Sequence, residues 1–453
     1  MLTYELEKKP GVPLYEALYR CIRSDILSGK LAPGQKLPSK RALAQNLEVS
    51  KITVEGAYDQ LLAEGYIRSQ EKVGYFVEAV AKARRPAPQD PAPREQPRWA
   101  LDFTANSCPD FPFTVWSSLQ RQVMLDLRRD LLRQLPNRGL WELRSAIAHH
   151  LAAFRGMEVD PENILIGAGT DFLYNLLIQL LGREKVYAVE EPGYGKIRKV
   201  YAAAGVRCVS APMDALGVRP DSLEDADVLH CSPSHHFPTG LVTPVSRRLA
   251  LLEWARDGKW IIEDDYDSEF RFDAHPKPAM QSLDHQGRVI YMNTFSKSLA
   301  PSIRISYMIL PGGLMAQFRQ RLGFYSCTVP SFEQYTLARF LSRGHFEKHI
   351  NRMRKFYKNR RNRVVTLLKT CRFSDRLTIL EQDAGLHFLV RVETSLSDET
   401  LKTRLAAAGL RIRSITDYYH LPDGENRHCF VVNYSVLDED ALEQALAQLP
   451  EQL

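Results

Sequence analysis

The chain has 453 residues, enough for two or three domains that each bury a core of their own. An apolar content of 44% and a charged content of 25% exclude a disordered or fibrous chain, and a net charge of +6 does not by itself indicate nucleic-acid binding. The seven cysteines lack zinc-ligand or disulfide-framework spacing and no apolar run is long enough to span a membrane, so we expect a reduced, cytoplasmic protein without a metal site.

Residues 1–78 are predicted to form a compact α+β domain. Three segments are apolar every three or four residues; Ser39 is placed to cap the second of them, and the third begins after Ser50. Residues 66–69 and 74–77 then alternate like two short strands joined by a polar turn. Three helices followed by a hairpin describe a winged helix-turn-helix, whose third helix reads the major groove of DNA.

Residues 79–100 change composition to proline, alanine, arginine and glutamine. A stretch of this kind cannot bury enough apolar surface to offset the entropy of ordering it, and its prolines keep it semi-extended. We therefore predict a linker between two domains.

Residues 101–453 are predicted to form the second domain. Its large part, about residues 150–330, alternates apolar runs with helical patterns, which predicts a mostly parallel sheet covered on both faces, with a ligand crevice at the carboxyl ends of the strands. The predicted strands lie at residues 164–166, 186–189, 206–209, 228–230, 260–262, 289–292 and 306–310. About residues 101–149 and 331–453 are assigned to a small α+β part, in which one helix runs from about residue 331 through Leu367 and strands follow at 386–390 and 429–434.

A lysine follows the strand predicted at residues 289–292. Lys297 is flanked by Phe295 and Leu299, and partial burial would favour its neutral, nucleophilic amine. Such an amine can hold an aldehyde cofactor as a Schiff base. The segment alone is also compatible with a basic loop at a strand end.

The strand predicted at residues 260–262 ends in carboxylates and a tyrosine. Because side chains alternate along a strand, Asp264 and Tyr266 share one face and Asp265 points to the other. Pyridoxal phosphate (PLP) needs an acid beside its ring nitrogen and a donor beside its phenolic oxygen, and Asp264 and Tyr266 suit these two positions. An acidic strand end can equally be a helix cap or a solvated loop.

A phosphate site is predicted where glycines after the strand at 164–166 lead into the amphipathic run at 172–181. The start of a helix presents free N–H groups to an anion, and Thr294 and Arg304 would complete the site. Tyr194, in a Glu-Glu-Pro-Gly-Tyr turn, could stack on the cofactor ring. A plain strand-to-helix turn and a surface tyrosine are the alternatives.

Four segments occur in the order and at the spacings of fold-type I aminotransferases: Glu191–Tyr194, Ser232–Gly240, Glu263–Asp267, and Ser296-Lys297 with Arg304. With the preceding winged helix, nearly the whole chain resembles the MocR/GabR group of bacterial transcriptional regulators. The resemblance implies a multidomain, head-to-tail homodimer: a GntR-type winged helix, then an α/β PLP-dependent transferase fold (fold-type I) with a small α+β C-terminal portion. It implies that Lys297 holds PLP as a Schiff base, that Asp264 contacts the ring nitrogen and that Tyr266 contacts the phenolate. Tyr194 would stack on the ring. The phosphate would be held by Gly169, Thr170, Thr294 and Arg304, and the rest of the cofactor site would include Ser296 and His235.

The GntR resemblance rests on segments 37–41, 50–54 and 63–66. It implies a double-stranded DNA operator as partner. The residues implied to contact it are Arg41, Ser50, Lys51, Thr53 and, at the wing, Gly74.

The chain departs from its relatives at three points. Enzymes of this fold place an arginine for the substrate carboxylate in the last strand, near Phe430 or Val431, where this chain has none. A tyrosine expected ahead of Gly139 is missing, and His236 replaces the usual glutamine. These losses favour cofactor binding over transamination of ordinary α-amino acids.

We interpret the chain as a PLP-binding transcriptional regulator that senses PLP itself or an amino compound through the aldimine at Lys297, with PLP favoured. A working aminotransferase with an accessory DNA-binding domain is the alternative. An effector acid would lack its usual partner, unless Lys196, Arg411 or Arg413 supplies one.

Overall fold

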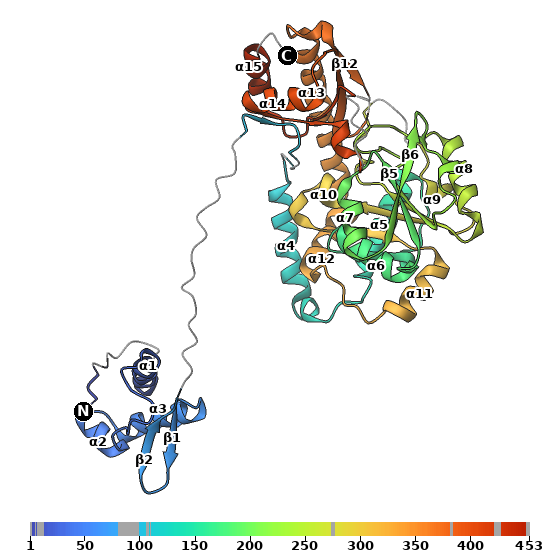
Figure 1. The fold of residues 1–453 in the computed structure, drawn as a ribbon. Helices are drawn as coiled ribbons and strands as arrows, with labels where there is room; N and C mark the ends of the chain where they lie inside the picture. Colours follow the sequence, from blue (N-terminus) through green and yellow to red (C-terminus); the bar gives the residue numbers. More distant parts are fainter. Residues whose placement is uncertain are drawn as a thin grey trace. The chain divides into compact units, whose positions relative to one another are not determined.

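The computed structural model describes residues 2–4, 6, 13–79, 99–105, 108, 110–272, 277–380, 384–420 and 427–449. The chain divides into two compact units, Met1–Gln96 and Pro97–Leu453 (Figure 1). The linker predicted at residues 79–100 lies almost wholly outside the described residues. No described helix combines the length and apolarity that crossing a membrane requires.

The first unit consists of three helices and a hairpin, as predicted. Its elements are α1 (Leu14–Ser28), α2 (Lys40–Asn46), α3 (Lys51–Ala63), β1 (Ile67–Gln70) and β2 (Gly74–Val77), with the two strands antiparallel. Ser39 accepts the Ala42 N–H, which confirms the predicted cap, and Ser50, after which the third helix was predicted to start, accepts the Thr53 N–H. Residues from all three helices and both strands share one buried core.

The second unit is built on an eight-stranded sheet of order β4-β11-β10-β9-β8-β5-β6-β7. The strands are β4 (Ile164–Gly167), β5 (Val186–Glu191), β6 (Arg207–Asp214), β7 (Gly217–Val218), β8 (Val228–Cys231), β9 (Trp260–Asp264), β10 (Val289–Thr294) and β11 (Ser306–Ile309). β11 is antiparallel to both of its neighbours and β7 to β6, whereas the pairs from β10 to β6 are parallel. The mostly parallel sheet predicted from the alternation of patterns is confirmed.

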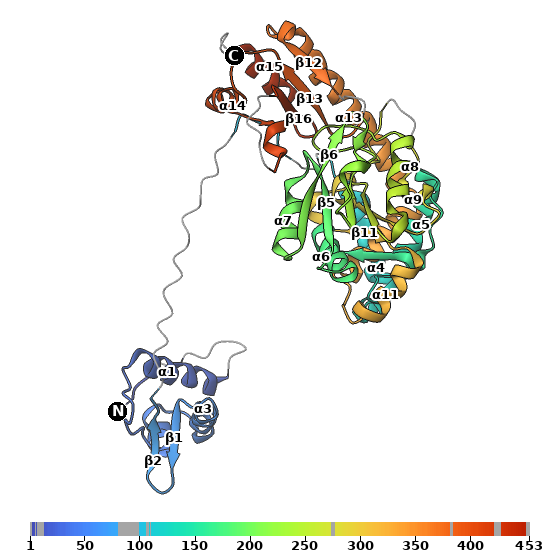
Figure 2. The ribbon, with the colours of Figure 1, turned by 45° about the vertical axis from the view of Figure 1, so that its right-hand side comes forward.

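Helices cover both faces of this sheet (Figure 2). Ile164 and Ile166 of β4 join one core, and Leu165 between them joins a core on the other side, as alternation along a fully buried strand requires. The helices of this part are α4 (Phe113–Leu127), α5 (Trp141–Arg155), α6 (Thr170–Leu181), α7 (Gly195–Ala203), α8 (Val245–Trp254), α9 (Met280–Leu283), α10 (Phe295–Ser298), α11 (Gly312–Leu322) and α12 (Ser331–Ser342).

The C-terminal part carries a second, four-stranded sheet of order β12-β13-β16-β15. Its elements are α13 (His345–Thr370), β12 (Leu377–Leu380), β13 (His387–Val392), α14 (Asp398–Ala407), β15 (Arg413–Ser414), β16 (Cys429–Asn433) and α15 (Glu439–Gln448). A separate short pair, β14 (Leu410–Arg411) with β3 (Leu101–Asp102), joins the start of this unit to its C-terminal part. The strands predicted at 386–390 and 429–434 correspond to β13 and β16.

One predicted helix is wrong. The segment expected to run unbroken from residue 331 through Leu367 is two helices, α12 and α13. Gly344 between them has a φ of 69°, a left-handed conformation that ends a helix and that glycine adopts without strain. Strong helix formers on both sides of this glycine made the pattern look continuous.

Candidate functional site

A cavity of about 1250 Å³ opens at the carboxyl ends of the parallel strands, where open α/β sheets bind their ligands. Its wall combines the ends of β5, β8, β9 and β10, the starts of α6 and α7, and residues of β15 and β16. Eight residues predicted for the site line it: Thr170, Tyr194, Asp264, Tyr266, Thr294, Ser296, Lys297 and Arg304. Gly169 and His235 lie directly beside these lining residues.

Asp264, the last residue of β9, faces the cavity. The Tyr174 hydroxyl donates to its Oδ2 at 2.5 Å, and His230 Nε2 lies 3.5 Å from the same oxygen. Burial and the carboxylate raise the pKa of Tyr174, so this phenol stays a donor. Oδ1 of Asp264 is buried and has no hydrogen-bond partner among the described residues. A protonated ring nitrogen is the kind of donor this oxygen can accept.

Asp265 lies on the opposite face of the strand, as predicted. Its Oδ2 is 2.8 Å from Arg155 Nη2, and both side chains are only 1% exposed. The Tyr291 hydroxyl also donates to Asp265, at 2.6 Å. Asp265 therefore belongs to a buried ion pair on the face of the strand that points away from the cavity, and it does not line the cavity.

Lys297 lies in α10, whose first turn is capped by Thr294. Burial lowers the pKa of Lys297, and the nearby Asp267 carboxylate only partly opposes this. A larger fraction of the amine is therefore neutral, and hence nucleophilic, than for an exposed lysine.

A cationic cradle lies at the N-terminus of α6. Gly169 has a φ of 92°, and a Cβ at this position would come within 2.0 Å of Arg304 Nη2, so only glycine lets the guanidinium approach. Asp171 Oδ2 lies 3.5 Å from Arg304 Nη2 and 2.6 Å from Lys196 Nζ. Two cations thus share one carboxylate beside the free N–H groups of Thr170 and its neighbours, which is an arrangement that can receive a phosphate.

Tyr266 and His235 form a further polar group beside the lysine. The Tyr266 hydroxyl lies 3.4 Å from His235 Nδ1, which is 2.8 Å from Asp267 Oδ2. Burial, Asp267 and Asp264 raise the pKa of Tyr266, so its hydroxyl remains a donor. Tyr194, which is 51% exposed, covers another part of the cavity and packs edge-on against Phe237.

Sequence reasoning assigned no ligand-binding role to several residues in and around this site. Glu190 and His236 lie side by side, with Oε2 and Nε2 3.5 Å apart. Burial raises the pKa of Glu190 to about 8 and lowers the pKa of His236 to about 3, so both are uncharged near neutral pH and the contact is not an ion pair. Tyr174 could have been found, because it follows Thr170 by one helical turn and so shares its face of α6.

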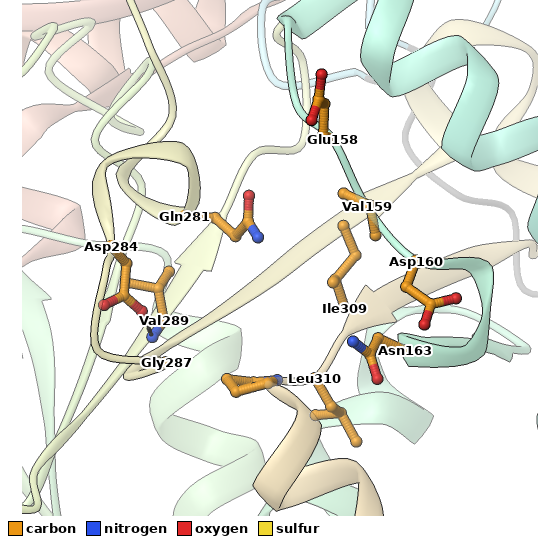
Figure 3. A pocket seen from close by; sticks show the side chains of 11 residues that line it. Glu158, Val159, Asp160, Asn163, Gln281, Asp284, Gly287, Val289, Ile309 and Leu310 are labelled. Atoms are coloured by element: carbon orange, nitrogen blue, oxygen red, sulfur yellow. Dashed lines mark hydrogen bonds between the residues drawn. The ribbon is translucent and has the colours of Figure 1, made fainter.

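A second, smaller cavity of about 110 Å³ lies at the opposite end of the sheet (Figure 3). Two of the three acids that line it are already used: Asp160 caps the turn at Pro161–Asn163, and Asp284 accepts backbone N–H groups from three residues. Nor does the described part of the chain hold a cluster of three metal-ligating side chains. The large cavity is therefore the candidate ligand site.

The residues predicted to contact DNA lie on α2, at the start of α3 and at the wing. Arg41 and Lys51 are exposed, and neither forms an ion pair within the described residues. Ser50 and Thr53 are joined by a 2.8 Å hydrogen bond at the first turn of α3, and Gly74 begins β2. A helix that presents an exposed lysine at its N-terminus suits insertion into the major groove.

Both units match known protein families. Residues 14–77 match the bacterial regulatory proteins of the gntR family, and residues 100–449 match aminotransferase class I and II. The chain is 36% identical to the uncharacterized HTH-type transcriptional regulator YdeL of Bacillus subtilis, with 93% of both chains covered. It is 32% identical to the probable rhizopine catabolism regulatory protein MocR of Rhizobium meliloti, covering 98% of this chain and 94% of that one. It is 30% identical to the HTH-type pyridoxine biosynthesis transcriptional regulator PdxR of Corynebacterium glutamicum, covering 94% and 93%.

The fold of the second unit is found in solved structures. The kynurenine aminotransferase of Pyrococcus horikoshii superposes with a TM-score of 0.67 at 24% identity, covering 78% of this chain and 90% of that one. At this identity the likeness establishes the fold, and the chemistry has to be argued from the side chains.

Proposed function

Because the chain belongs to the MocR-type transcriptional regulators, in which a GntR-family helix-turn-helix domain precedes an aminotransferase class I and II domain, we propose that it is a PLP-binding regulator whose cofactor site controls its affinity for DNA. One observation carries the proposal. A lysine with a lowered pKa, an aspartate with a free buried oxygen and a cationic cradle meet in one cavity.

The residues of the cavity fit PLP. Gly169, Thr170 and Arg304 would hold the phosphate at the start of α6. Asp264 Oδ1 would accept a hydrogen bond from the protonated ring nitrogen, and the Tyr266 hydroxyl would donate one to the phenolic oxygen. When bound, PLP supplies an aldehyde carbon that condenses with primary amines. The Lys297 side chain, whose pKa is lowered by burial, is the amine of this chain that would hold that aldehyde carbon.

Two kinds of signal suit this cavity. PLP itself is the simplest signal, because its binding would neutralise the cradle and fill the space around Lys297; the relative whose name refers to pyridoxine biosynthesis supports this idea. An amino compound that competes with Lys297 for PLP is the second. In both cases the occupied cavity would change how the winged helix binds its operator, through Arg41 and Lys51 on the reading surface.

Turnover as an aminotransferase is a second candidate function. It is favoured by the presence, in one cavity, of the residues that would hold PLP, including Lys297, Asp264 and Tyr266. Val431, not an arginine, faces the cavity from β16, so an α-carboxylate lacks the usual bidentate partner on this strand. We therefore favour regulation over turnover.

The test uses full-length protein, apo and PLP-loaded, with an operator selected from random DNA. PLP should produce a visible absorbance band, borohydride should fix pyridoxyl on Lys297, and Lys297→Ala should lose the band while keeping its thermal transition. Operator affinity should differ between the apo and loaded forms, or between loaded forms with and without an amine. Equal affinity in all of these states would refute the proposal, and catalytic keto-acid formation from an amino donor would favour the enzyme.

A further inference from the structure

Ile52 differs from the other apolar side chains of the first unit in its exposure. It is 79% exposed, whereas the other exposed large apolar side chains described in this unit, Tyr15, Leu27 and Val73, are 39–45% exposed. It belongs neither to the buried core of the unit nor to the partly buried residues that pack against this core. A β-branched side chain at an exposed helix position also favours the helix less than alanine or leucine would. Packing among the described residues therefore does not require an isoleucine here.

The position of Ile52 in the fold is that of a base-reading side chain. It is the second residue of α3, and recognition helices contact base edges with their N-terminal residues. The Ser50 hydroxyl accepts the Thr53 N–H at 3.1 Å and is hydrogen-bonded to the Thr53 hydroxyl at 2.8 Å, so this first turn is held in place. Within a helix isoleucine has one strongly preferred χ1 rotamer, so little side-chain freedom is left to lose on binding.

The charges around Ile52 allow a polyanion to approach. Two acids, Glu55 and Asp59, lie one and two turns further along the same side of α3. The Lys40 Nζ atom lies 3.2 Å from Glu55 Oε1 and 3.1 Å from Asp59 Oδ1. Part of their negative charge is therefore compensated within the unit, and the exposed Lys51 adds a cation at the start of the helix. Phosphates beside this surface meet less repulsion than the two acids alone would cause.

The major groove of DNA offers one apolar group to such a side chain. Every base pair presents hydrogen-bonding groups there, but only thymine adds a methyl group, at C5. Contact between this methyl group and an exposed isoleucine removes apolar surface of both from water, which is favourable without any hydrogen bond. Because the Ile52 side chain has no polar atom, the thymine methyl group is the feature of a base edge that it can select.

We propose that Ile52 is a specificity-determining residue that contacts the C5-methyl group of a thymine in the operator. This rests on the proposed function, since it requires that α3 enters the major groove of an operator. It assigns part of the sequence preference to an apolar contact, beside the polar contacts expected from Arg41 and Lys51.

The experiment uses full-length protein and an operator selected from random double-stranded DNA. Each thymine of the selected site is replaced singly by deoxyuridine, which lacks only the C5-methyl group. Wild-type protein should bind roughly three- to five-fold less tightly when the thymine next to Ile52 is replaced, the loss expected for one methyl group at about 0.8 kcal/mol. Ile52→Ser should bind both forms equally at that position and should keep the wild-type pattern at every other thymine.

Two further variants and one stability measurement assign the effect to this side chain. Ile52→Val keeps a branched apolar side chain and should retain most of the deoxyuridine effect. Leu27→Ala is the matched control, because it truncates an exposed apolar side chain of α1 and should leave the deoxyuridine pattern unchanged. Ile52→Ser should keep the melting temperature of wild type, because Ile52 is exposed and the two residues have similar helix propensities.

The outcomes separate the two proposals. Selection that enriches no DNA sequence would contradict the proposed function itself, because the protein would then have no operator. An operator in which no thymine shows a deoxyuridine effect that depends on Ile52 would overturn this inference alone. So would an effect that Leu27→Ala removes equally, or a marked fall in the melting temperature of Ile52→Ser, since the side chain would then be needed for the fold.

Discussion

Two adjacent aspartates of this chain should have opposite roles, which makes their asparagine variants the sharpest test of the strand register. Asp265 is in an ion pair with Arg155 at 2.8 Å, with both side chains 1% exposed. Removing one partner of a buried pair leaves the other charge buried and costs about 3–5 kcal/mol. Because Arg155 keeps its 3.0 Å hydrogen bond to Ser234, we expect Asp265→Asn to cost about 3 kcal/mol, near the lower limit.

Asp264→Asn should behave in the opposite way. Its amide oxygen can still accept the Tyr174 hydroxyl, so the unfolding free energy should fall by no more than about 1.5 kcal/mol. PLP retention should fall sharply, because the negative partner of the ring nitrogen is gone. Asp265→Asn should retain PLP in the fraction that remains folded.

The assay combines urea unfolding of the full-length variants with PLP release followed by absorbance. Burial alone would raise the pKa of Asp265, but Arg155 and Tyr291 outweigh it and hold the pKa below its usual value. The stabilisation is therefore present above the unfolded-state pKa of about 3.9 and is lost as pH falls through the lower folded-state pKa. The stability gap between wild type and Asp265→Asn should close in acid. If the two variants lose stability and PLP to the same extent, the assignment of the two faces of β9 is wrong.

Three further predictions follow from individual residues. Gly169→Ala should weaken PLP binding about ten-fold in a PLP titration, because the new Cβ would displace Arg304 and the backbone would be strained by about 1–3 kcal/mol. Unchanged binding would contradict the assignment of the cationic cradle as the phosphate site. Arg41→Ala and Lys51→Ala should each reduce operator affinity by about 1–3 kcal/mol in gel shifts if they contact base edges, and no loss in either would exclude this reading surface. Glu190→Gln mimics the protonated form of Glu190, whose pKa rises from 4.5 to about 8 on folding. The stability of this variant relative to wild type should therefore increase between about pH 5 and pH 8 and then level off, and a pH-independent difference in melting temperature would contradict this.

Local patterns predicted the elements that position the site. Alternation in β9 assigned Asp264 and Asp265 to opposite faces, the cap at Ser39 was predicted, and the third helix was predicted to start after Ser50, because these features depend on neighbouring residues only. The glycine at 344 was visible too, but its effect on a run of strong helix formers was underestimated.

Long-range partners could not be predicted in this way. Arg155 and Asp265 are far apart in sequence, and nothing in the pattern around either residue indicates the other. The position of Arg413 opposite Val431 depends on the register between β15 and β16, which hydrogen bonds across the sheet determine.

The short connection between β10 and β11 has a consequence for binding energetics. Thr294 and Ser306 are register partners joined by a 2.8 Å hydroxyl hydrogen bond, and the loop between them carries both Lys297 and Arg304. Closing this loop costs conformational entropy once, during folding, and not again when a ligand arrives. The hairpin therefore fixes the backbone positions of an amine and a cation relative to each other before any ligand arrives. A molecule whose aldehyde and anionic group match that spacing would bind at a smaller ordering cost than a molecule of another length.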